Sequence, residues 1–404
     1  MPSADSLAPL ALALLLVLAG CGGATTDEPT TNVTAIDLQD ARHPAVAVEH
    51  TVTVENGTLP VNATLTLARV QALLDSDAEP WPVRVRNLSE WRANLGRVGA
   101  SPLNRALGFE NVSVDWAEPT GLTKFGTVYV HPGDGAAGAT ERVLAHEFVH
   151  LVQYRTNMLP WLSDLRQTRL TTDRLKTRQA LVEGGAVYVA DAYTRQYLDV
   201  ETNSAYVRAL YRTESATHRS ALAQYRFGAQ YVAHRIDDPA NLSRVYESYP
   251  RTTEQVMHNY TRAEEPPANL SVDAAGGGNW TYLGNNTLGE MAIRSALGTE
   301  LPRDRAAAAA TGWGTDRLLV SQHATNESRW GWVLVARWDT PAETDDLLAA
   351  LDAYATARDA DSPSAFRTRT LDEKTVALVF GDPAYVDRTS VTDHDGGVSV
   401  NVAG

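Results

Sequence analysis

The segment AHEFVHLVQY, Ala145–Tyr154, constrains the fold and chemistry of this chain more than any other stretch. It places His146, Glu147 and His150 in the order H-E-x-x-H, shortly after Thr140, which can cap a helix. On a helix, two histidines four residues apart project from the same side and can bind one metal ion. Apolar residues form a second face, so we expect this helix to pack into a core. The alternative is a buried helix whose histidines bind no metal.

A catalytic zinc ion takes three protein ligands and leaves a fourth position for water. Glu147 lies next to the first histidine, where a carboxylate can act as general base and then as general acid. The longer pattern H-E-x-x-H-x-x-G-x-x-H does not apply, because position 153 is Gln and position 156 is Thr. A zinc site of three histidines is therefore excluded, and a Glu from a later helix is the expected third ligand.

Glu183 is the best candidate for that ligand. It is the acidic residue of an otherwise apolar helical turn in LVEGGAVYVADAY. A carboxylate there is costly unless it is paired or binds a metal. The alternatives are that Asp164 or Asp173 is the third ligand, or that there is none. In that last case Glu183 would be a partly exposed residue beside two glycines, without a role in the site. Asp191 is a candidate partner for a ligand histidine.

LAHEFVHLVQY and EGGAVYVADAY together resemble the Glu-zincins, especially bacterial and archaeal peptidase-MA-like proteins. Their pattern is H-E-x-x-H-x-x-Q, followed by W-L-x-E-G-x-A on the next helix. The E-G-x-A element is present at Glu183, but LPWLS, Leu159–Ser163, is separated from it by a charged insertion. Two further segments, YPRTTEQVMHNY and ATGWGTDRLLV, resemble salt-adapted archaeal surface lipoproteins with a zincin-like domain. The resemblance covers about residues 120–340.

The resemblance implies an α+β fold in which a zincin-like domain combines a small mixed sheet with the H-E-x-x-H helix and the helices after it. It also implies Zn²⁺ as cofactor, and the segment AQYRFGAQYVAHRI matches the family's third helix. Tyr225 in that segment occupies the position of a group that stabilises the oxyanion. Tyr231, Tyr193 and His258 are alternatives. The strand at Val128–Val130 is expected to offer its edge to an extended substrate.

The N-terminus predicts export and a lipid anchor. Leu7–Gly20 is an apolar stretch of 14 residues, too short to span a membrane but suited to a signal peptide. It ends in LAGCGG, which resembles a lipobox, and Cys21 is the one cysteine in the chain. The segment before it contains no Lys or Arg, and an ordinary signal peptide is the alternative. Residues 1–21 are thus a predicted signal peptide with lipidation at Cys21, followed by a flexible tether over 22–45.

Glycosylation sequons support a location at the cell surface, on the outer face of the membrane. The pattern N-x-[ST] includes 11 of 17 asparagines, far more than chance would place there. Besides Asn32, the candidates are Asn56, Asn62, Asn87, Asn111, Asn241, Asn259, Asn269, Asn279, Asn285 and Asn326.

Composition excludes nucleic acid as a partner. The formal net charge is −14, and only three of the 35 basic residues are lysine. Phosphate backbones need a basic surface, which such a chain does not provide. An acidic chain that uses Arg in place of Lys is typical of proteins that stay soluble in high salt.

Two domains are expected, a zincin-like domain over 46–300 and a small α+β domain over 301–404. Long helices are predicted at 178–196 and about 221–236, and a Trp-rich hairpin at 317–339. Its alternation places Trp330, Trp332 and Trp338 on one face. The glycine-rich segment 273–280 is expected to be a linker and the last 12 residues a loose tail.

Two functions of different classes fit these features. The first is a lipid-anchored zinc metallopeptidase that acts on a peptide or protein substrate. The second is a catalytically inactive surface lipoprotein on a zincin fold, with the Trp-rich hairpin as its contact surface. The intact Glu147 favours the first, because an inactive site does not need the base.

Overall fold

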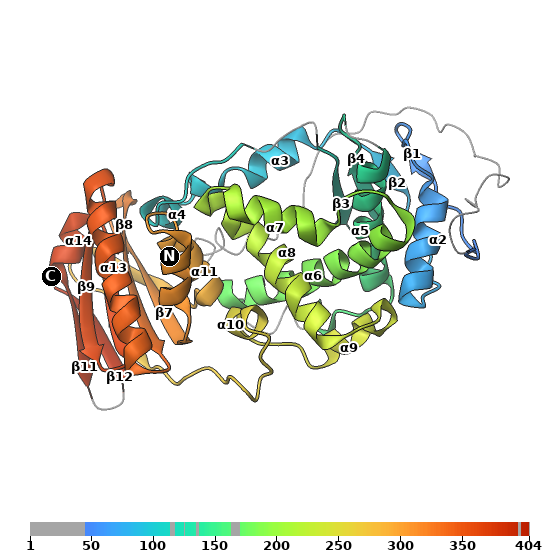
Figure 1. Cartoon of the computed structure of the whole chain (residues 1–404). Helices are drawn as coiled ribbons and strands as arrows, with labels where there is room; N and C mark the ends of the chain where they lie inside the picture. The colour runs from blue at the N-terminus through green and yellow to red at the C-terminus, as the bar shows by residue number, and fades with distance from the viewer. Residues whose placement is uncertain are drawn as a thin grey trace.

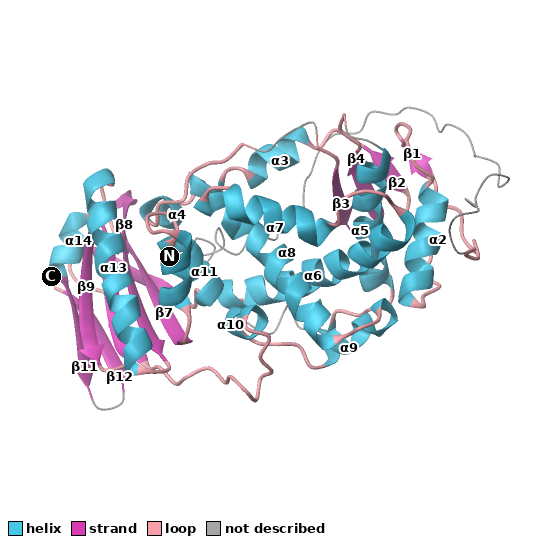
Figure 2. Cartoon of the chain, in the orientation of Figure 1, coloured by secondary structure: helices cyan, strands magenta, loops and turns pink. Residues whose placement is uncertain are grey.

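The computed structural model describes residues 45–113, 118–124, 126–134, 137–162, 170–394 and 397–403. The predicted signal peptide, Cys21 and the tether up to residue 44 lie outside the described residues. The fold is α+β. Figures 1 and 2 show a helical part that packs on a small sheet at one end of the molecule, and larger sheets at the other end. Among the described residues, none of the helices combines the length and the apolar composition needed to cross a bilayer.

The first sheet has the strand order β1-β2-β4-β3. Its strands are β1 (Val54–Glu55), β2 (Val83–Val85), β3 (Thr120–Lys124) and β4 (Thr127–His131). β4 lies between β2, to which it is parallel, and β3, to which it is antiparallel. The expectation that Val128–Val130 offers a free edge is therefore wrong, because β4 is an inner strand and the two edge strands are β1 and β3. Strand order depends on pairing between distant segments, which alternation within one strand does not reveal.

In the sequence, the apolar alternation of residues 45–67 indicates strands with a turn at Asn56-Gly57, and residues 67–77 are predicted to form a short amphipathic helix. The helix is confirmed, but it begins four residues earlier than expected, inside the segment predicted as a strand. Helix α2 covers Ala63–Leu74, and the Asn62 side chain accepts a hydrogen bond of 3.0 Å from the Leu65 N–H. Such a cap satisfies a free amide of the first turn and favours the helix over a strand. The predicted Asn56-Gly57 turn joins no hairpin either, because β1 pairs in parallel with β2.

Helices build the centre of the molecule, and the predicted helices at 178–196 and about 221–236 are confirmed within α6 and α8. The helices before the C-terminal part are α2, α3 (Ser89–Leu95), α4 (Pro102–Ala106), α5 (Ala137–Arg155), α6 (Thr172–Tyr197), α7 (Asn203–Thr213), α8 (Ala216–Arg235), α9 (Leu242–Glu247) and α10 (Thr253–Met257). Short 3-10 turns lie at Val98–Ala100, Pro160–Leu162 and Pro239–Asn241. The core of this part joins α2, α5, α6 and α8 to the first sheet.

The C-terminal part contains a five-stranded antiparallel sheet of order β6-β7-β8-β10-β9. Its elements are β6 (Trp280–Asn286), α11 (Glu290–Leu297), α12 (Arg303–Ala310), β7 (Trp313–His323), β8 (Asn326–Trp338), α13 (Pro341–Asp361), β9 (Ala365–Asp372) and β10 (Thr375–Gly381). The predicted hairpin is confirmed as β7 and β8. Its Trp332 and Trp338 are buried in the core shared with α13, while Val333 and Val335 pack against the second C-terminal sheet. The Trp face is thus mainly core.

The expected loose tail is wrong, because the chain ends in paired strands. α14 (Pro383–Arg388) leads into β11 (Thr389–His394), which pairs with β12 (Gly397–Val402), and β12 pairs in parallel with β5 (Val272–Ala275). The glycine-rich segment expected to be a linker therefore contributes residues to both C-terminal sheets. These sheets begin before residue 300.

Helices α6 and α8 cross at two glycines. A Cβ atom on Gly184 would lie 2.1 Å from the Gly228 carbonyl carbon, and one on Gly228 would lie 1.8 Å from the Ala180 carbonyl oxygen. Both contacts involve backbone atoms, which cannot rotate away. The two helices therefore approach as closely as their main chains allow.

We predict that Gly228→Ala lowers the free energy of unfolding by about 2–3 kcal/mol, because overpacking forces the two backbones apart. Gly298→Ala is the control. Gly298 ends α11 with a φ of −71°, and a Cβ atom there would meet its nearest neighbour at 3.3 Å. Urea denaturation of both variants measures the difference, and equal stability would contradict the close crossing.

Candidate metal centre

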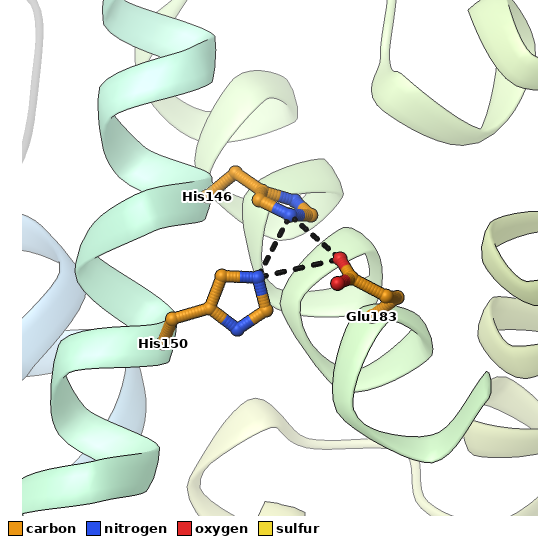
Figure 3. A group of neighbouring side chains, drawn as sticks. All are labelled: His146, His150 and Glu183. Atoms are coloured by element: carbon orange, nitrogen blue, oxygen red, sulfur yellow. Dashed lines mark hydrogen bonds and ion pairs between the residues drawn. The ribbon is translucent and has the colours of Figure 1, made fainter. Parts of the chain in front are cut away.

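Helices α5 and α6 bring His146, His150 and Glu183 together (Figure 3). The two histidine Nε2 atoms lie 3.1 Å apart, and each lies 3.3 Å from Glu183 Oε2. Ligand atoms arranged as a tetrahedron around zinc, with bonds of about 2.0–2.1 Å, lie about 3.4 Å apart. Two imidazole nitrogens and one carboxylate oxygen are also a donor set that zinc accepts. These three residues could therefore hold one zinc ion.

His150 is buried, whereas His146 and Glu183 are only partly buried, so the group is reachable from solvent. Their exposed fractions are 13% for His146, 9% for His150 and 18% for Glu183. Burial opposes ionisation of both His150 and Glu183, yet their mutual attraction outweighs it. The pKa of His150 is raised, and that of Glu183 is lowered by the two histidines. Glu183 is therefore held as an anion, which suits a ligand of a divalent cation.

Gln153 holds His150 in place. Its Oε1 lies 2.8 Å from His150 Nδ1, and its Nε2 donates to the Val182 carbonyl at 3.0 Å and to the Tyr246 hydroxyl at 2.8 Å. Because these donations orient the Gln153 amide, we assign the His150 proton to Nδ1, which leaves the Nε2 lone pair free for a metal. In the sequence, the one feature that indicates this role of Gln153 is its position three residues after His150, in the pattern H-E-x-x-H-x-x-Q.

Asp191 does not serve as a partner of the ligand histidines, contrary to expectation. Its carboxylate accepts hydrogen bonds from the Ser204 amide, at 3.1 Å, and from the Ser204 hydroxyl. The alternative ligand Asp173 is also engaged elsewhere, because it accepts from the Thr253 amide and hydroxyl at 2.8 and 2.6 Å. Asp164 lies outside the described residues.

Glu147 is buried between α5 and the edge strand β3. Its Oε2 accepts a hydrogen bond of 2.7 Å from the Thr123 hydroxyl. A Cβ atom on Gly121 would lie 2.3 Å from Glu147 Cγ, so this stretch of β3 lies directly against the carboxylate. Burial raises the pKa of Glu147, and the nearby His150 and His146 reduce this effect without cancelling it. The group is therefore a stronger base than an exposed carboxylate.

Tyr225 lies beside the three candidate ligands. Its ring centroid is 6.3 Å from that of His146. Burial and the charges of Glu183 and Glu147 raise its pKa well above the usual value, so the hydroxyl keeps its proton and can donate. The three alternatives have other partners. Tyr193 donates to Glu141 at 2.5 Å, Tyr231 lies under Arg235, and His258 bonds Glu290 at 2.9 Å.

Most of the glycosylation candidates lie on the surface. The asparagines classed as exposed are Asn56, Asn87, Asn111, Asn269, Asn279, Asn285 and Asn326. Asn62, Asn241 and Asn259 are half-buried.

Comparisons with known proteins concern the C-terminal part. Residues 281–400 match a family described as a domain of unknown function (DUF8575). This span covers most of the C-terminal sheets and excludes the candidate ligands. Neither a curated protein nor a solved structure matches the chain.

We predict that Gln153→Leu weakens zinc binding about 10–100-fold, because His150 loses the partner that orients its ring. Asp191→Asn is the matched control and should leave the affinity unchanged, since Asp191 bonds Ser204. Competition with a chromophoric chelator measures both. Equal affinity for zinc in the wild type and Gln153→Leu would show that Gln153 has no part in the site.

Proposed function

We propose that this chain is an extracytoplasmic, lipid-anchored zinc metallopeptidase with a zincin-like fold. The observation that carries the proposal is the group of three donor atoms 3.1–3.3 Å apart, with the buried Glu147 on the same helix as the two histidines. His146, His150 and Glu183 would hold the zinc ion. When bound, zinc supplies a Lewis acid that polarises a carbonyl group and lowers the pKa of water.

Glu147 is the proposed general base and acid. It accepts the proton of the attacking water and then delivers it to the leaving amine, so the proton balance closes within one turnover. The Thr123 hydroxyl bonds Oε2 and leaves Oε1 for this transfer. The raised pKa of Glu147 makes its carboxylate a better acceptor of the proton from the attacking water, while the carboxylic acid can still deliver that proton to the leaving amine.

Tyr225 is the proposed donor to the oxyanion that forms on the substrate carbonyl, since its hydroxyl stays protonated beside His146. The edge strand β3 is the proposed docking site for an extended substrate backbone. Because Gly121 and Thr123 contact Glu147, a peptide paired with β3 would pass beside the base.

We predict that Glu147→Gln lowers peptide cleavage about 10²–10⁴-fold while zinc stays bound, because the amide cannot accept the proton. Glu247→Gln, which changes an exposed carboxylate on α9, is the control and should cleave like the wild type. Cleavage of an unfolded protein substrate and zinc content by mass spectrometry are measured together. Equal cleavage by Glu147→Gln and the wild type would refute the mechanism. A zinc-loaded wild type without cleavage would favour the inactive binding lipoprotein.

The anchor is tested separately. We predict that Cys21→Ser moves the protein from the membrane fraction to the soluble fraction, because the lipid attached to the thiol is lost. Radiolabelled lipid should label the wild type and not Cys21→Ser. Membrane retention of Cys21→Ser would contradict lipidation at this residue.

A further inference from the structure

A second group of titratable side chains lies where the helical part meets the C-terminal sheets. Glu254 belongs to α10, Glu265 to the segment after α10, and Asp339 directly follows β8. One carboxylate oxygen from each residue lies within 4.8 Å of the other two. The proposed peptidase makes no use of these residues.

Glu254 is the member of this group that most needs a positive partner. It is 3% exposed, and no described residue forms a hydrogen bond or an ion pair with its carboxylate. Burial, followed by the charges of Glu290, Asp339 and Glu265, raises its pKa to about 10. The charge of Glu290 is countered by His258 at 2.9 Å, whereas none of the described cationic side chains forms an ion pair with Glu254. A buried carboxylate without a partner is unfavourable in its charged form, so Glu254 needs either a proton or a cation.

The group is held in place by bonds that leave its carboxylates free. Gln255, fully buried, donates from Nε2 to the Glu265 carbonyl at 2.6 Å and accepts from the Arg251 amide at 2.7 Å. The Asp339 amide donates to the Gly312 carbonyl at 2.9 Å. Lys374 Nζ donates to the Asp339 carbonyl, so one positive charge offsets part of the negative charge of the group. Three carboxylates and one ammonium leave a net negative site.

We propose that Glu254, Glu265 and Asp339 bind a hard divalent cation of the calcium class that links the helical part to the C-terminal sheets. All three donors are carboxylate oxygens, and an all-oxygen set suits Ca²⁺ and Mg²⁺, whereas zinc sites in proteins include nitrogen or sulfur ligands. Bonds of about 2.4 Å place oxygens on opposite sides of a calcium ion about 4.8 Å apart. The three oxygens lie within 4.8 Å of one another, so they can share one Ca²⁺ ion. Mg²⁺ demands near-ideal octahedral geometry at about 2.0–2.1 Å and gives up its water reluctantly, which makes it the less suited cation. The proposal does not depend on the peptidase function.

Calorimetric titration of the chelator-treated protein with CaCl₂, together with thermal unfolding, tests the proposal. The wild type should bind about one Ca²⁺ per chain and show a saturable rise in Tm, because a ligand of the folded state stabilises it. Glu254→Gln and Asp339→Asn should bind at least about tenfold more weakly and lose the rise. Asp346→Asn removes an exposed carboxylate on α13 and should respond like the wild type.

Each variant is compared with and without Ca²⁺, because Glu254→Gln removes a buried charge and can raise Tm by itself. Mg²⁺ should produce a smaller rise in the wild type. The same Ca²⁺ response in His146→Ala would show that the effect is separate from the zinc ligands. The absence of Ca²⁺ binding to the wild type, or an equal rise in Glu254→Gln, would overturn the proposal. A wild type stabilised by low pH but not by Ca²⁺ would overturn it too. That result would indicate that a proton shared among the three carboxyl groups takes the place of the cation.

Discussion

The position of Glu183 depends on the two glycines that follow it. Gly184 lies against the α8 backbone, and a Cβ atom on Gly185 would lie 2.3 Å from the Tyr246 hydroxyl and 3.1 Å from Gln153 Nε2. Each glycine in a helix interior costs about 0.5–1 kcal/mol relative to alanine. That cost is offset here by close packing on two sides of α6. The packing holds Glu183 against the α5 histidines and seats Tyr246 beside Gln153, so one short sequence fixes both the third donor and the partner of His150.

The two glutamates of the centre have opposite environments. Glu183 faces both histidines, which lower its pKa despite burial, whereas Glu147 is dominated by burial against β3 and its pKa is raised. A pair of titratable groups whose environments push their pKa values apart indicates a division of roles. Glu183 suits a permanent negative ligand and Glu147 a group that gains and loses a proton. The opposite shifts therefore support the roles proposed for them.

Sequence reasoning was most successful where a property depends on local spacing. The 3.6-residue period places His146 and His150 on one side of α5, and alternation assigned the two faces of β8 correctly. The predictions were wrong where a property depends on segments that are far apart in the chain. β4 is an inner strand because β2 pairs with it, and Asp191 turns to Ser204 and away from the histidines. At Asn62 the error was local. The alternation of apolar residues was given more weight than the capping side chain of Asn62, which starts helix α2.

The acidic group at Glu254 shows why some sites leave no trace in a sequence. Glu254 is in the first turn of a short helix, where the exposed amides favour a negative charge, so it looks like an ordinary solvated residue. It becomes buried because α11 packs on α10 and the chain returns over Gln255. Its neighbours Glu265 and Asp339 are 11 and 85 residues further along the chain. A helix terminus alone does not compensate a carboxylate that faces two others, and α10 is too short to provide more than its first turn. The compensation must come from a proton or a cation, and a cation would also hold together the two parts of the molecule that supply its ligands.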